Sequence, residues 1–160
     1  MRSPKVLFIG LDNILIGTRS GKSMAQGIWD LKFEMPTLRK IKEAKPEYVF
    51  IETNQYGIGL IATEEEFEAK LDYVVACVKA FAKHEDLKGV DSIYCASIEE
   101  NDPYKKPNCG MLQYMIDYYK INYSKDSMLM VGNLSTDEDT AKNFDIKYLD
   151  IKEFLSIEFT

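Results

Sequence analysis

The chain has 160 residues, of which 46% are apolar and 29% charged, a composition that fits one folded domain and excludes wholesale disorder. No run of about 18 apolar residues is present, so we expect no membrane span. The three cysteines follow no paired spacing, which argues against a disulfide framework or a zinc site. Because the N-terminus also lacks a signal-peptide pattern, we expect a cytoplasmic protein.

The charge is unevenly spread along the chain. The net charge of −6 argues against strong non-specific binding to nucleic acid, which needs a positive surface. Residues 1–45 nevertheless carry a net +5, whereas residues 46–160 carry a net −11. The sequence therefore allows a local basic surface in the N-terminal third, although a solvated surface of mixed charge is the simpler interpretation.

Short β-branched runs alternate along the chain with segments of helical periodicity. This alternation predicts an α/β fold, a three-layer sandwich with a central parallel sheet. We expect a single domain over residues 1–160, with no insertion long enough for a large cap domain. In chain order the expected elements are a strand at 6–9, a helix at 36–44, a strand at 48–52, a helix from the cap at 63 to about 83, a strand at 92–96, a helix at 107–121, a strand at 128–131, a helix at 136–143, a strand at 146–149 and a final helical turn.

Polar residues follow the expected strands. Asp12 comes soon after the first strand, Thr53 and Asn54 follow the second, Lys106 comes after the third, and Asp137 follows the fourth. In a parallel sheet these positions meet at the carboxyl edge, where such folds place their sites. Hydroxyl and amide donors, a lysine charge and carboxylates that hold Mg²⁺ form a set that suits a phosphate group.

Four segments carry a resemblance to a known family. Their order resembles that of the four motifs of the haloacid-dehalogenase-like (HAD) phosphatase superfamily, which has a Rossmann-type fold. The segments are GLDNIL at 10–15, TNQYGIG at 53–59, KKPNCGM at 105–111 and GNLSTD at 132–137.

One further stretch narrows the resemblance. The sequence TRSGK at 18–22, with Trp29 and Pro36 further on, is similar to the 3′-phosphatase domain of polynucleotide kinase-phosphatases. That resemblance implies a phosphomonoester hydrolase, with a 3′-phosphate end of a nucleic acid or another phosphomonoester as its partner.

The resemblance also implies roles for individual residues. In the family, the first Asp of the first motif attacks the phosphate and the second acts as acid and base, while a lysine bridges nucleophile and phosphate. Here Asp12 and Lys106 occupy the acid/base and lysine positions. Thr53, Asn54 and Lys106 occupy the phosphate-binding positions.

The metal and entrance positions follow in the same way. In the family, Asp residues of the fourth motif hold Mg²⁺, and the matching positions here, with Asp12, are Asn133 and Asp137. Arg19 and Lys22 lie in the stretch that flanks the substrate entrance, where they can contact a nucleic-acid backbone.

The sequence departs from the family at three positions. Gly10 stands in place of the nucleophile, Ile14 in place of a Thr, and Asn133 in place of the first Asp of the fourth motif. Glycine cannot form a covalent intermediate, and deleting the nucleophile of a hydrolase costs roughly 10⁶ in turnover. We therefore expect impaired catalysis and weakened binding of Mg²⁺. We also expect Lys106 to lose its nearest partner, which leaves it free for phosphate, although Glu52 can replace part of the lost negative charge.

Three functional hypotheses stay open. The first is a polynucleotide 3′-phosphatase-like protein that binds a phosphate end without turning it over. The second is an active Mg²⁺-dependent phosphatase in which a shifted register makes Asp12 the nucleophile. The third is a protein-interaction module on the same scaffold, with Ile14 and Leu134 closing the mouth of the pocket. The sequence identifies no protein partner.

Overall fold

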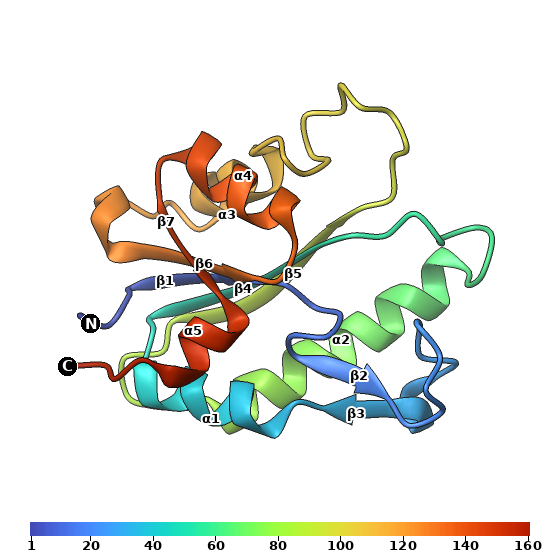
Figure 1. The fold of residues 1–160 in the computed structure, drawn as a ribbon, viewed down its shortest axis with the longest axis horizontal. Coiled ribbons are helices and arrows are strands. Elements are labelled where there is room, and N and C mark those ends of the chain that lie inside the picture. Colours follow the sequence, from blue (N-terminus) through green and yellow to red (C-terminus); the bar gives the residue numbers. More distant parts are fainter.

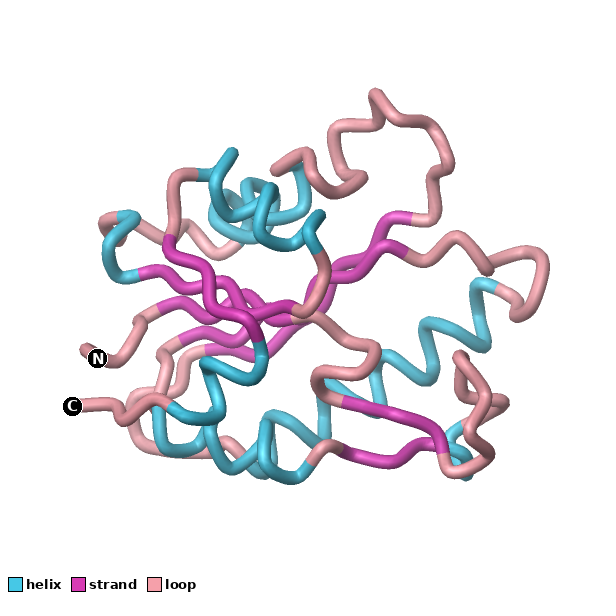
Figure 2. Tube along the Cα trace, in the orientation of Figure 1, coloured by secondary structure: helices cyan, strands magenta, loops and turns pink.

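The computed structural model describes residues 1–160 and is built around a five-stranded sheet in which all neighbouring strands are parallel (Figures 1 and 2). The strand order is β5–β4–β1–β6–β7. The central strand β1 is fully buried, which explains why its sequence is continuously apolar. The strands are β1 (Val6–Ile9), β4 (Tyr48–Asn54), β5 (Gly89–Cys95), β6 (Met128–Gly132) and β7 (Lys147–Asp150).

Helices cover both faces of the sheet and complete the predicted three layers (Figure 1). Helices α1 (Met35–Ala44), α2 (Glu64–Phe81) and α5 (Ile151–Ser156) pack on one face, against the side chains of Leu7 and Ile9. Helices α3 (Gly110–Tyr118) and α4 (Ser135–Phe144) pack on the other, against Val6 and Phe8. No helix combines the length and the apolar character needed to cross a bilayer.

Local sequence signals set the start of α2. The Thr63 hydroxyl accepts a hydrogen bond from the Glu66 N–H at 3.2 Å, and the Glu66 carboxylate accepts one from the Thr63 N–H at 2.9 Å. This reciprocal capping box satisfies two of the backbone donors that a helix leaves free at its N-terminus.

Helix α3 begins at Gly110, three residues later than the expected start at 107. The preceding segment is folded into turns instead, because Asn108 N–H donates to Lys105 C=O and Gly110 N–H donates to Pro103 C=O, both at 2.8 Å. These turns fix the backbone next to Lys106.

A two-stranded antiparallel hairpin, β2 (Ile16–Thr18) and β3 (Leu31–Phe33), was absent from the sequence prediction. Its strands are too short to show an alternating pattern. The loop between them folds onto Asp30, a buried carboxylate that accepts hydrogen bonds from the backbone of Gln26 and from the backbone and hydroxyl of Ser20. These bonds, that of Gln26 first, lower the pKa of Asp30.

Candidate active site

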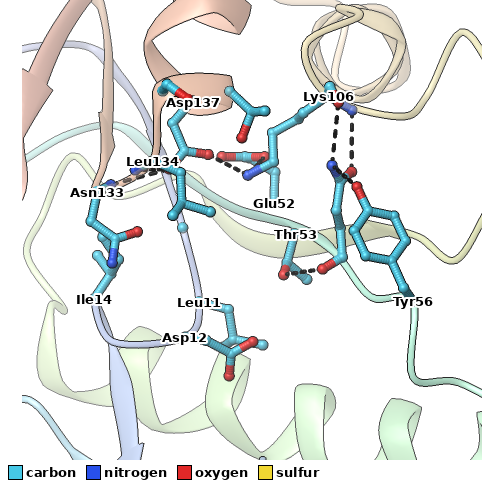
Figure 3. Close-up of a pocket in the computed structure, with 14 residues that line it drawn as sticks. Leu11, Asp12, Ile14, Glu52, Thr53, Tyr56, Lys106, Asn133, Leu134 and Asp137 are labelled. Atoms are coloured by element: carbon cyan, nitrogen blue, oxygen red, sulfur yellow. Dashed lines mark hydrogen bonds and ion pairs between the residues drawn. The ribbon is translucent and has the colours of Figure 1, made fainter. Parts of the chain in front are cut away.

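A cavity of about 350 Å³ opens at the carboxyl edge of the sheet, at the point where β4 and β6 flank β1 (Figure 3). Sheets of this type place their ligands at such a switch in strand order. The cavity brings together six of the predicted site residues, namely Asp12, Thr53, Asn54, Lys106, Asn133 and Asp137.

The strand register puts Gly10 between Glu52 and Gly132. Ile9 pairs with Ile51 of β4 and with Val131 of β6, so the next residues of the three strands form one row across the sheet. Residues paired in parallel strands direct their side chains to the same face. Glu52 therefore supplies the only side chain in a row whose other two members are glycines.

Lys106 joins two carboxylates, that of Glu52 at the end of β4 and that of Asp137 in the first turn of α4. Its Nζ lies 3.1 Å from Glu52 Oε2 and 2.5 Å from Asp137 Oδ1 (Figure 3). All three side chains are buried. The expectation that Lys106 loses its nearest partner is therefore wrong, because β4 provides a carboxylate one strand away. Burial by itself lowers the pKa of the Lys106 ammonium. The negative charges of Glu52 and Asp137 have the larger combined effect, so the pKa of Lys106 is raised.

Glu52 is held by charge rather than by hydrogen bonds. Neither of its carboxylate oxygens has a hydrogen-bond partner of good geometry, although Oε2 lies close to the Lys106 ammonium. Burial raises the pKa of Glu52 to about 7, and Asp137 adds to this rise while Lys106 works against it. The carboxylate therefore changes its charge near neutral pH.

Asp137 is fixed through both carboxylate oxygens. Oδ1 contacts Lys106, and Oδ2 accepts hydrogen bonds from the backbone N–H groups of Asn133 and Leu134, each at 3.1 Å. Gly132 makes room for this arrangement, because a Cβ there would lie 2.4 Å from Asp137 Oδ2. The turn into α4 is thus shaped around this carboxylate.

Asp12 lies beyond the end of the central strand, in the turn that leads into β2. Its Oδ2 accepts a hydrogen bond from Gln55 Nε2 at 2.7 Å, and the same amide donates to Thr53 Oγ1 at 3.0 Å. Gly10, in contrast, continues the sheet, since its N–H donates to Val131 C=O at 3.1 Å. Sequence reasoning did not assign a role to Gln55, although it belongs to the quoted 53–59 segment.

Asn54 positions the segment that carries Lys106. Its Oδ1 accepts a hydrogen bond from Lys106 N–H at 3.1 Å, and its Nδ2 donates to Tyr56 Oη at 2.9 Å. The amide therefore ties the end of β4 to the loop that precedes α3.

Arg19 and Lys22 lie outside the cavity, on the β2–β3 loop. The Arg19 Nε donates to Leu31 C=O at 3.1 Å, and Lys22 Nζ lies 3.4 Å from Gln26 Oε1. Both side chains remain exposed.

The mouth of the cavity is not closed by an apolar plug. The expected closure needs both Ile14 and Leu134, but the Leu134 side chain is 58% exposed. Ile14 is buried, and its Cγ1 would lie 3.4 Å from a Cβ placed on Gly10. Ile14 thus fills space beside Gly10 and leaves the cavity open.

The comparisons with known proteins agree with this geometry. Residues 5–159 match the family described as polynucleotide kinase 3 phosphatase. The chain belongs to this family. Its fold is that of the HAD-like phosphatases, with a central parallel sheet and no large cap.

Solved structures show the same fold at low identity. A D,D-heptose 1,7-bisphosphate phosphatase from B. bronchiseptica, complexed with magnesium and phosphate, aligns with a TM-score of 0.69 at 15% identity, over 90% of this chain and 78% of its own. A protein from Mesorhizobium loti assigned as a HAD-like phosphatase gives 0.65 at 19% identity, over 91% of this chain and 71% of its own. A protein from Bacteroides fragilis assigned as a haloacid dehalogenase-like hydrolase aligns with a TM-score of 0.55 at 12% identity, over 98% of this chain and 95% of its own. No curated protein matches the chain.

The charge of Glu52 predicts how stability depends on pH. The folded pKa of about 7 lies well above the ordinary value of a glutamate, so the folded state holds this proton more tightly than the unfolded state. The free energy of unfolding should therefore fall between about pH 5 and pH 8, by up to about 3 kcal/mol. Urea denaturation of Glu52→Gln should show no such fall in this window.

A matched control is Glu47→Gln. Ion pairs and hydrogen bonds, that of Lys88 first, lower the pKa of Glu47 to about 2, so its effect on stability lies below the window. This variant should keep the wild-type slope between pH 5 and pH 8. An unchanged slope in Glu52→Gln would contradict the assignment of the titrating group.

Gly10 and Gly132 should differ in how well they tolerate a substitution by alanine. Gly132→Ala would displace the Asp137 carboxylate and should destabilise the protein by about 2 kcal/mol or more. Gly10→Ala meets only an ordinary contact with Ile14 and should change the free energy of unfolding by less than about 1 kcal/mol. Denaturant titrations of both variants test this, and equal losses would contradict the geometry of the row.

Proposed function

We propose that this protein binds the phosphate end of a phosphomonoester, a 3′-phosphorylated nucleic-acid strand, without hydrolysing it. The observation that carries the proposal is the row of Glu52, Gly10 and Gly132 across the carboxyl edge of the sheet. In this row the position that the family uses for attack has no side chain.

Glu52 does not restore the missing chemistry. Its carboxylate is fully buried, carries a raised pKa and faces the Lys106 ammonium. A nucleophile must be ionised and reach the phosphorus atom in line. The role that fits Glu52 is that of a counter-charge, which keeps Lys106 paired after the loss of the carboxylate at position 10.

The residues of the cavity do not fit a Mg²⁺ ion. Mg²⁺ is held by one or two carboxylates together with substrate oxygens. Here residue 10 offers no oxygen, and both carboxylate oxygens of Asp137 are already engaged. No group of three or more His, Cys, Asp or Glu side chains is placed to hold a metal. We therefore propose that Mg²⁺ binds weakly, even though the B. bronchiseptica phosphatase carries it.

Phosphate binding should compete with Glu52 for Lys106. Lys106 is the one cationic side chain in the cavity wall, and Glu52, Asp12 and Asp137 are acidic. A phosphate dianion gains the ammonium fully only when Glu52 takes up a proton. The Thr53 hydroxyl accepts a hydrogen bond from Gln55 and donates only a long one, 3.4 Å, to Asn54 C=O, so its proton can turn to a phosphate in the cavity.

A nucleic-acid end fits the setting of the cavity better than a small metabolite. The family match spans almost the whole chain, and no large cap encloses the cavity. The exposed Arg19 and Lys22 stand on the neighbouring loop, where they can meet backbone phosphates of a strand.

Turnover assays test the loss of catalysis. With Mg²⁺ present, the wild-type protein should not hydrolyse p-nitrophenyl phosphate or a 3′-phosphorylated oligonucleotide. The triple variant Gly10→Asp, Glu52→Gln, Asn133→Asp should gain metal-dependent hydrolysis, because it restores both carboxylates and removes the competing one. The same variant with Gly10→Asn is the matched control and should stay inactive. Wild-type hydrolysis that Asp12→Ala abolishes would contradict the proposal, because the unmodified cavity would then be catalytic.

Calorimetric titration with a 3′-phosphorylated oligonucleotide tests binding. Since Glu52 must be protonated, the affinity should rise roughly fivefold to tenfold from pH 8 to pH 6.5. Glu52→Gln should bind more tightly at pH 8 and lose the pH dependence. The same strand with a free 3′-hydroxyl is the control. Equal affinity for the two strands would contradict the proposal and leave the cavity with a structural role.

A further inference from the structure

A second cavity, of about 330 Å³, is separate from the one described above. It lies between the β2–β3 loop, the segment that precedes α2 and the first two turns of α2, and it shares no wall residue with the first cavity. Its wall is mostly apolar, with side chains that include Met24, Ile28, Ile61 and Phe67. A cavity of this size lies at the lower end of the range for small-molecule sites.

The wall of this cavity contains a buried lysine that lacks a partner. Lys70 is only 6% exposed and takes part in no hydrogen bond or ion pair. Its Nζ lies 4.9 Å from the centroid of the Phe67 ring, which offers the face of an aromatic ring but no acceptor oxygen. Burial lowers the pKa of Lys70, against a smaller opposing effect of Asp12.

The acidic groups nearby do not satisfy Lys70. Asp12 acts on it through its charge, but the Asp12 Oδ2 is taken by Gln55. Glu66, the one acid in the cavity wall, is exposed and uses its carboxylate to cap α2 through the Thr63 N–H. The Lys70 side chain has lost most of its contact with water and has no acceptor in the protein, so an anion that enters this cavity meets a donor that no other group shares.

From the unpartnered Lys70 and its apolar surroundings, we propose that this cavity binds a small carboxylic acid with an apolar chain. The carboxylate accepts a hydrogen bond from Lys70 Nζ, and the chain packs against Met24, Ile28 and Ile61. A single negative charge matches the single cation of the wall. A phosphate dianion needs more donors than this wall supplies.

Octanoate is a suitable probe, and 1-octanol is its uncharged counterpart. Two-dimensional ¹H–¹⁵N NMR titrations should show octanoate shifting the amide signals of residues 24–28 and 61–70. Octanoate should bind about tenfold more tightly than 1-octanol, as expected for one charge-assisted hydrogen bond. Lys70→Met should remove this preference, and Lys70→Gln is the second variant if Met disturbs the fold.

Lys79→Met is the matched control, because Lys79 lies on the same helix with its side chain exposed. It should keep the wild-type preference for octanoate. Equal affinity for the two probes in the wild type, a preference that survives in Lys70→Met and Lys70→Gln, or shifts confined to other regions would each overturn the proposal. None of these outcomes depends on the function proposed for the first cavity.

Discussion

The arrangement of the first cavity depends on one buried ammonium that must be paired. Lys106 lies in the interior, where an isolated charge is strongly disfavoured. The resemblance described above implies a carboxylate at position 10 beside this lysine, and the chain has a glycine there. Glu52 from β4 and Asp137 from the first turn of α4 hold the ammonium. The chain thus offers a carboxylate on the strand next to position 10, and this carboxylate pairs the lysine.

The burial of Glu52 beside Lys106 links stability to ligand binding. Glu52 is buried without good hydrogen bonds, so it takes up a proton near neutral pH. Any ligand that draws Lys106 toward itself leaves Glu52 less well compensated and favours its protonated form. The cavity therefore holds a carboxylate whose charge depends on pH and on whether a ligand is bound.

The fold was largely predictable from the sequence, because buried parallel strands are apolar runs and α2 carries a capping box. The family order of polar residues at the strand ends also located Asp12, Thr53, Lys106 and Asp137 at one edge of the sheet. The hairpin β2–β3 escaped prediction, since three-residue strands show no periodicity and their loop is organised by Asp30.

The pairing of Lys106 could be predicted only in part. Glu52 stood out as a charge at the end of an apolar strand, but its contact with Lys106 depends on β4 lying next to β1. Strands β1 and β4 are neighbours in the sheet but not in sequence. The expectation that Lys106 lacks a partner was wrong for this reason, because the sequence does not show which strands lie side by side. The burial of Lys70 could not be predicted either. One lysine on a long helix looks like any exposed lysine in the sequence, and its burial depends on the β2–β3 loop that packs over α2.

The most direct test of the pairing of Lys106 is a crystal structure of the protein at pH 8 with Mg²⁺ and phosphate added. The Lys106 ammonium should stay between Glu52 and Asp137, Asp12 should keep its hydrogen bond with Gln55, and no metal ion should join Asp12 to Asp137. A Mg²⁺ ion held by Asp12 and Asp137, with a phosphate in line with the Asp12 carboxylate, would contradict this expectation.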